Sequence, residues 1–197
     1  MLSKKRGFVF TTIITLLSFI SVAYFSCTKT GSNPLSCDGI YCDNGGHCNL
    51  GRCICPAGYE GLYCSTPSAS KFVGTWDLTQ KITGSDSANV IGKDSSYVLF
   101  LKKSATPTTF MMNNFYGNAN YNNIICTIDS TVTSNFIVDT LTPFHMLWNQ
   151  IRVLPGSWGT VSANDSLITM NLIVRHLTAT SNWQKDTLLV KLTPHKF

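Results

Sequence analysis

Three hydrophobic patterns follow one another along the chain. Residues 1–26 begin with the cations Lys4, Lys5 and Arg6 and continue as a long apolar run, which is typical of an export signal. Residues 37–64 contain few large apolar side chains. From residue 71 onward, short runs of alternating apolar and polar residues are separated by Gly, Pro, Asn and Asp. This last pattern predicts β-strands joined by tight turns, because no stretch keeps a helical period.

The alternating region predicts a mainly β domain of about eight short antiparallel strands, arranged as a barrel or a sandwich. The clearest alternation, in residues 168–174, places the apolar side chains on one face and Arg175 on the other. Cys126 alternates with two isoleucines, so we expect it to be a buried free thiol. The expected strands lie within residues 71–80, 97–102, 109–113, 123–129, 134–139, 144–153, 157–161, 166–176 and 186–193.

Six cysteines crowd into residues 37–64, spaced C-x4-C-x5-C-x4-C-x-C-x8-C. A segment with so little apolar material cannot build a core of its own, so we expect disulfide bonds to hold it together. Spacing alone leaves many pairings open. A zinc site that includes His47 is the alternative reading, and the export signal argues against it because exported thiols are oxidised.

The end of this stretch, CICPAGYEGLYC, resembles the EGF-like signature C-x-C-x5-G-x2-C, and Asn-Gly-Gly before Cys48 is also typical of EGF-like modules. Calcium-binding members carry an acidic cluster before the first cysteine. Residues 33–36, Asn-Pro-Leu-Ser, offer no carboxylate there, so we expect no metal. The resemblance implies the disulfides Cys37–Cys48, Cys42–Cys53 and Cys55–Cys64.

Cys27 directly follows the apolar run, in the sequence Tyr24-Phe25-Ser26-Cys27. This tetrapeptide resembles the lipobox of bacterial lipoproteins, in the loose form found in Bacteroidetes. Ser26 is the small residue expected there, whereas Tyr24 and Phe25 depart from the pattern. The resemblance implies that Cys27 carries acyl chains such as palmitate. It also implies an address in the cell envelope, at the outer membrane on its periplasmic or surface face. The alternative is an uncleaved N-terminal membrane anchor.

These boundaries divide the chain into five segments. We expect a signal peptide (1–26), a lipid-anchored tether (27–36), an EGF-like domain (37–64), a linker (65–70) and a β-barrel domain (71–197). The formal charge of +5 is concentrated in the first segment. Without residues 1–26, which hold three bases and no acids, 12 bases face 10 acids. A nearly neutral mature chain without a basic stripe gives no electrostatic basis for nucleic-acid binding.

Gly74-Thr75-Trp76 opens the first expected strand of the large domain. It resembles the G-x-W motif of lipocalins. The resemblance implies an eight-stranded antiparallel barrel in which Trp76 packs across the closed end, beneath a basic residue of the last strand. Lys191 is the candidate for that residue, although the family generally uses Arg. An antiparallel β-sandwich is the alternative fold.

The sequence contains no nucleophile elbow, and His145, His176 and His195 lack metal-site spacing, so we expect no enzyme activity and no cofactor. Our first hypothesis is that a small apolar or amphipathic ligand binds inside the barrel. An inward Arg152 or Arg175 could then pair with a ligand carboxylate. A hollow interior would support this hypothesis, and a filled one would count against it. The alternative is a surface adhesion or protein-interaction protein, with the EGF-like module as spacer or partner-binding element.

Overall fold

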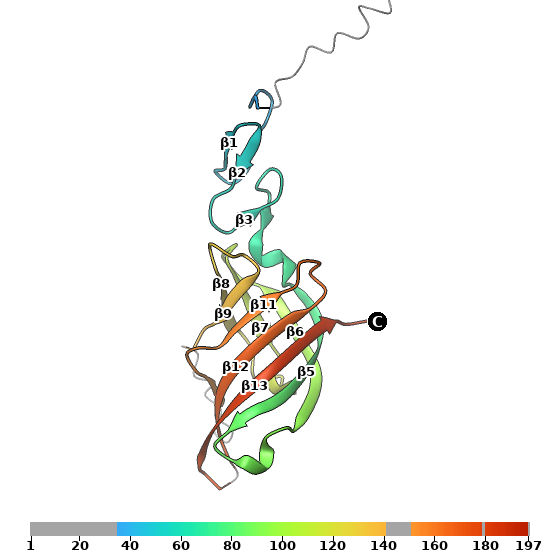
Figure 1. The fold of residues 1–197 in the computed structure, drawn as a ribbon, viewed down its shortest axis with the longest axis vertical. Coiled ribbons are helices and arrows are strands. Elements are labelled where there is room, and N and C mark those ends of the chain that lie inside the picture. Colours follow the sequence, from blue (N-terminus) through green and yellow to red (C-terminus); the bar gives the residue numbers. More distant parts are fainter. Residues whose placement is uncertain (1–34, 141–150, 179, 197) are drawn as a thin grey trace, which may run out of the picture.

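The computed structural model describes residues 35–140, 151–178 and 180–196, which form a small cysteine-rich part followed by a β-barrel (Figure 1). The predicted export signal, the anchor that is its alternative, and Cys27 lie outside the described residues. No helix in the described part of the chain is long and apolar enough to cross a membrane.

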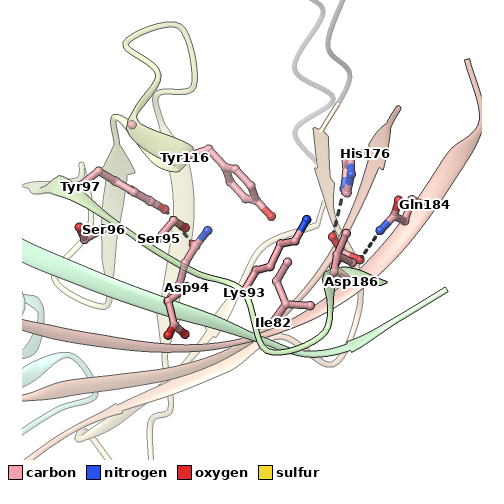
Figure 2. Close-up of a pocket in the computed structure, with 13 residues that line it drawn as sticks. Ile82, Lys93, Asp94, Ser95, Ser96, Tyr97, Tyr116, His176, Gln184 and Asp186 are labelled. Carbon is pink, nitrogen blue, oxygen red and sulfur yellow. Dashed lines mark hydrogen bonds and ion pairs between the residues drawn. The ribbon is translucent and has the colours of Figure 1, made fainter. Parts of the chain in front are cut away.

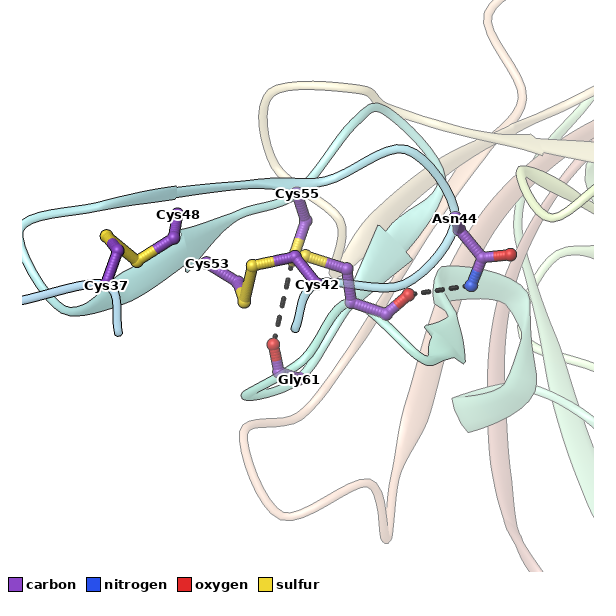
Figure 3. The surroundings of a disulfide bond; sticks show 8 residues. Cys37, Cys42, Asn44, Cys48, Cys53, Cys55 and Gly61 are labelled. Carbon is purple, nitrogen blue, oxygen red and sulfur yellow. Dashed lines mark hydrogen bonds between the residues drawn. A yellow bond between two sulfur atoms is a disulfide. The ribbon is translucent and has the colours of Figure 1, made fainter. Parts of the chain in front are cut away.

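Residues 37–64, which we call the cysteine module, contain the hairpin of β1 (His47–Asn49) and β2 (Arg52–Ile54). Figure 3 shows how disulfides replace a core there. Each bridge stabilises such a module by roughly 2–4 kcal/mol. The three bridges are Cys37–Cys48, Cys42–Cys53 and Cys55–Cys64. This pairing is the one implied by the EGF-like resemblance, so that prediction is confirmed.

The expected linker, residues 65–70, is structured rather than open. Its strand β4 (Thr66–Pro67) pairs with β3 (Tyr59–Glu60) of the cysteine module. The 3₁₀ helix η1 (Ser68–Lys71) follows at once, and its first two residues are buried. The chain therefore passes from module to barrel without a flexible stretch at this point.

The cysteine module rests on one end of the barrel. The ammonium of Lys71 lies 2.9 Å from a carboxylate oxygen of Glu60, the only glutamate in the chain. The hydroxyl of Thr133, in the loop after β8, lies 3.1 Å from the Lys71 ammonium and 3.2 Å from the same Glu60 oxygen. The amide of Ala69 donates to the carbonyl of Pro107. These contacts join the module, and the segment that follows it, to two loops at the same barrel end.

Eight antiparallel strands close the barrel, in the order β5-β6-β7-β8-β9-β11-β12-β13 and back to β5. The predicted fold class is thus confirmed, and the sandwich alternative is wrong. The 3₁₀ helices η2 (Ala88–Val90) and η3 (Phe115–Gly117) lie between strands. The strands are β5 (Gly74–Ser85), β6 (Asp94–Lys103), β7 (Thr109–Asn113), β8 (Ile124–Ile128), β9 (Asn135–Val138), β11 (Trp158–Val161), β12 (Ile168–Leu177) and β13 (Trp183–Pro194).

A further strand, β10 (Ile151–Val153), pairs with the part of β12 that β11 does not reach. The buried hydroxyl of Ser157 fills the gap between β10 and β11. It accepts the amide hydrogen of Ile173 at 2.9 Å and donates to the carbonyl of Leu154 at 2.9 Å. β10 and β11 therefore lie one after the other along β12 and together fill a single strand position beside it. The first seven residues of the expected strand 144–153 lie outside the described residues.

Aromatic rings fill the barrel end that carries the cysteine module. Phe72 stacks on Phe110 with ring centroids 4.6 Å apart, and both rings meet the edge of Phe136. All three side chains are almost completely buried. Gly159 lies opposite Phe136 in the ladder, and a Cβ at this glycine would fall 2.2 Å from the Phe136 ring. This end is therefore closed by close-packed side chains.

Trp76 belongs to the same closed end, at 4% exposure, and its indole N–H donates to the carbonyl of Phe72 at 3.0 Å. Gly74 lies against the indole, since a Cβ there would be 3.4 Å from the indole nitrogen. Lys191, however, is exposed between the buried residues Val190 and Leu192. The expected packing of Lys191 over Trp76 is wrong, because strand alternation turns this side chain to the outer face.

Two other predictions about side-chain direction are confirmed. Cys126 is a buried free cysteine, and burial raises the pKa of its thiol well above the ordinary value. Arg175 lies exposed on the outer face of β12, while Ile168, Met170 and Leu172 are buried.

Candidate functional site

A cavity of about 660 Å³ opens at the barrel end opposite the cysteine module. Thirteen residues line it (Figure 2), and most come from the far ends of β5, β6, β12 and β13. We call this space the mouth cavity. The polar side chains on which its chemistry depends are Gln80, Tyr97, Tyr116, His176, Gln184 and Asp186.

A buried carboxylate lies in the wall of the mouth cavity. Asp186 is 3% exposed, and the side-chain amide of Gln184 donates to its Oδ1 at 3.0 Å. The Gln184 amide nitrogen also lies 2.8 Å from the hydroxyl of Ser85. On the other side, Nδ1 of His176 lies 3.6 Å from Asp186 Oδ2, which is too long for a hydrogen bond.

His176 Nδ1 is itself buried and has no hydrogen-bond partner. A buried polar atom without a partner destabilises the folded state by about 1–3 kcal/mol. The gap between this nitrogen and Asp186 Oδ2 leaves both atoms able to bond to a third group. The pair is therefore incomplete as a structural element.

Two phenols line the cavity near this pair. The Tyr97 hydroxyl donates to the side-chain oxygen of Gln80 at 3.3 Å. Burial raises the pKa of Tyr97 above its ordinary value, and a hydrogen bond with the Tyr116 backbone acts in the opposite direction. Burial also raises the pKa of Tyr116, and the nearby Tyr97 and Asp186 add to that rise. Both phenols therefore stay neutral near pH 7 and can donate hydrogen bonds.

Tyr116 is held in the cavity wall by an unusual backbone. Its φ angle is +57°, and Asn114, two residues earlier, has a φ angle of +64°. The left-handed region is rare for a bulky residue and costs about 1–3 kcal/mol. The Asn114 side-chain amide donates to the carbonyl of Val98 at 2.7 Å, which ties the turn to β6. Figure 2 shows the Tyr116 hydroxyl and the Lys93 amine pointing into the same space.

The residues proposed from sequence as ligand contacts lie elsewhere. Arg152 and Arg175 are exposed on the outer wall, and their guanidinium groups lie over the Trp183 ring at 5.6 and 5.0 Å. Neither arginine can reach a ligand inside the barrel from there, so the inward placement offered for a ligand contact is wrong, and the outward face predicted for Arg175 by alternation is right. The cause is again strand alternation. Ile151 and Val153, on either side of Arg152, point inward, so the side chain of Arg152 points outward.

The histidines are not gathered into one site. His176 lines the mouth cavity, whereas Nδ1 of His195 lies 2.6 Å from a carboxylate oxygen of Asp77 near the closed end. His145 lies outside the described residues. Among the residues that the structure describes, no group of three or more His, Cys, Asp or Glu side chains could hold a metal ion.

The sequence did contain a signal for the mouth cavity that we missed. The inward positions of β13 run Leu192, Val190 and Leu188, and the same alternation then reaches Asp186 and Gln184. Polar residues at the end of an inward series mark the place where a barrel stops being filled by apolar side chains. The partnership with His176 could not be read from the sequence, because it depends on how β12 pairs with β13.

Comparison with known proteins gives a short match. Mouse vasorin is 46% identical over 44 residues, which make up 20% of this chain and 6% of vasorin. The chain therefore resembles only a small part of that protein. No protein-family profile matches the chain.

Proposed function

We propose that this protein is a non-catalytic binding protein of the cell envelope that holds a small amphipathic ligand in the mouth cavity. The observation that carries the proposal is the incomplete Asp186–His176 pair inside a cavity of about 660 Å³. Pockets for small ligands commonly measure about 300–1,000 Å³ and combine apolar walls with a few placed polar groups.

The lining favours an amphipathic ligand over a purely apolar one. An apolar molecule would leave His176 Nδ1 without a partner and would strip water from Asp186. A hydroxyl or amine could donate to the carboxylate, and a hydroxyl could also accept a hydrogen bond from His176 or Tyr116. The apolar part of such a ligand would rest on Ile82 and Val90, which line the same cavity.

The same geometry supports binding rather than catalysis. In the described part of the chain, no hydrogen bond joins His176 to a hydroxyl or thiol that could act as a nucleophile. The free thiol of Cys126 is buried in the core and its pKa is raised, so it is poorly suited to react.

The cell-envelope address is also part of the proposal, and it rests on the sequence resemblances at residues 1–27. Intact-mass measurement of protein extracted from membranes tests it. We expect a mass that matches a chain beginning at Cys27 with acyl groups attached. A mass equal to the full unmodified chain would rule out lipidation and leave the uncleaved anchor.

A fluorescent amphiphile provides the binding test. N-phenyl-1-naphthylamine is neutral, carries one N–H donor and brightens in apolar surroundings. We expect it to bind the full chain, and we expect Asp186→Asn to weaken this binding at least about tenfold, or 1.4 kcal/mol, because a charge-assisted hydrogen bond is lost.

Lys191→Gln serves as the matched control, because it changes one charge on the outer wall of the same strand. It should leave binding of the probe unchanged. Equal affinity in wild type and Asp186→Asn, with both folded by circular dichroism, would contradict the proposed site. Absence of any binding to the wild type would contradict the proposed function.

A second candidate function is favoured by the surface of the cysteine module. Tyr41, Leu62 and Tyr63 are 78%, 71% and 50% exposed, and the amide of Asp43 donates to the Tyr63 carbonyl, which joins the two segments of the module that carry them. A contiguous exposed apolar patch marks a protein contact, and these three side chains are the candidates for such a patch. A photo-crosslinking residue at position 62 should give a discrete adduct on cells, whereas one at position 102 on the barrel should not.

A further inference from the structure

Three cations stand side by side on the outer wall of the barrel. Arg152 on β10 is the register partner of Arg175 on β12, and Arg175 is in turn the partner of Lys185 on β13. All three side chains are exposed. We call this set the cationic row. Like charges directly opposite each other destabilise a sheet, so the row weakens the isolated protein.

Trp183 fixes the two arginines of the row. Both guanidinium groups lie over its ring, 5.6 Å away for Arg152 and 5.0 Å for Arg175. Each such contact is attractive, because the face of the indole ring is electron-rich and the guanidinium group is cationic. Because the two guanidinium groups are already held against the indole, less side-chain entropy would be lost when they bind an anion.

The protein itself only partly neutralises the row. At its β13 end, the carboxylate of Asp86 accepts the backbone amide of Lys185 at 2.9 Å. Asp186 and His176 lie on the opposite, inner face of the same two strands. None of the salt bridges formed in the described part of the chain involves Arg152, Arg175 or Lys185. The two arginines therefore remain the uncompensated part of the row.

We propose that the cationic row is a phosphate-recognition site. A phosphate group carries up to about two negative charges and three strong acceptor oxygens, which suits two forked guanidinium groups and one ammonium. Arginine forks bind such oxygens in pairs, and lysine adds a point charge. The phosphate can come from a lipid headgroup or from a soluble phosphate ester. The site lies outside the barrel and is independent of the mouth cavity.

Calorimetry of the full chain in an uncharged maltoside detergent tests this site. The probes are glycerol 3-phosphate, short-chain phosphatidic acid and short-chain phosphatidylcholine. We expect both phosphomonoesters to bind at low salt and Arg152→Gln/Arg175→Gln to weaken them at least about tenfold. Similar affinity for both indicates recognition of the phosphate group itself. Much tighter binding of phosphatidic acid, with phosphatidylcholine weak, indicates a lipid headgroup.

The matched control is Lys102→Gln/Lys103→Gln, which removes the same charge from exposed positions at the end of β6. Binding should stay within about twofold of wild type in this control. Arg152→Lys/Arg175→Lys keeps the charge and loses the forks, so it should bind several-fold more weakly than wild type. Equal weakening in the two glutamine variants would show a general charge effect and overturn the proposal. Failure of the wild type to bind either phosphomonoester would overturn it as well.

Discussion

The two ends of the barrel are made by the same eight strands and are filled in opposite ways. At the closed end, Phe72, Phe110 and Phe136 pack ring against ring, and the cysteine module rests on the loops above them. At the other end, Tyr97 and Asp186 line a space of about 660 Å³. One end therefore stabilises the fold, and the other is available for binding.

This contrast shows which end of the barrel can tolerate a cost in folding stability. The closed end leaves no room for a ligand, because its side chains are close-packed. The mouth carries costs that a stability-optimised protein would avoid. His176 Nδ1 has no partner and Tyr116 has a left-handed backbone, whereas the closed end bears one cost of this kind, the unpartnered buried hydroxyl of Ser68. Costs of this kind gather at functional sites and are borne by the rest of the structure.

Truncation of a closed-end ring should have the largest effect. Phe110 is fully buried and contacts both Phe72 and Phe136, so Phe110→Ala should lower the free energy of unfolding by about 3–5 kcal/mol. At the mouth, Tyr97→Phe removes one hydroxyl and should change it by about 1 kcal/mol or less. Urea unfolding of both variants measures the difference. Similar losses would mean that the two ends contribute alike.

An added methyl group at the closed end should have the next largest effect. In Gly159→Ala the new Cβ would lie 2.2 Å from the Phe136 ring, and overpacking of this kind costs about 1–3 kcal/mol. Gly84→Ala is the matched control on β5, because its Cβ would meet Thr187 at an ordinary 3.6 Å. The thermal unfolding midpoint should fall for Gly159→Ala and stay unchanged for Gly84→Ala. A tolerated alanine at 159 would show that the aromatic cluster can shift.

Strand alternation made most of the fold readable from the sequence. It separates the buried series of β12 from Arg175, and it places Cys126 in the core. The same rule should have excluded Lys191 as a cover for Trp76, since Lys191 lies between Val190 and Leu192. At this position the lipocalin resemblance and the local pattern disagree, and the structure agrees with the local pattern.

The candidate site was harder to predict, for a physical reason. Alternation tells which residues point inward but not how far the core fills the barrel. Gln80 and Asp186 occupy inward positions like those of Leu78 and Leu188, and only the strand pairing shows that the polar members meet at one end. The cationic row depends in the same way on the register of β10 with β12.

The smallest expected difference between the two ends is in how the free energy of unfolding changes at alkaline pH. Burial raises the pKa of Tyr97 and Tyr116 above the ordinary value of 10.0. Above about pH 10 the unfolded chain therefore loses phenolic protons that the folded chain keeps, and stability falls as pH rises. Each tyrosine contributes a fall of up to about 1.4 kcal/mol per pH unit in the free energy of unfolding.

Tyr97→Phe/Tyr116→Phe should flatten this fall, and Tyr41→Phe should not, because Tyr41 is 78% exposed on the cysteine module. Urea unfolding between about pH 9 and pH 11 measures the slopes. Below about pH 10 the wild type and the double variant should show parallel pH dependence, because both folded and unfolded tyrosines are then protonated. An undiminished fall in the double variant would mean that the loss of stability at alkaline pH arises away from the mouth. The titration of Tyr97 and Tyr116 would then no longer distinguish the two ends of the barrel.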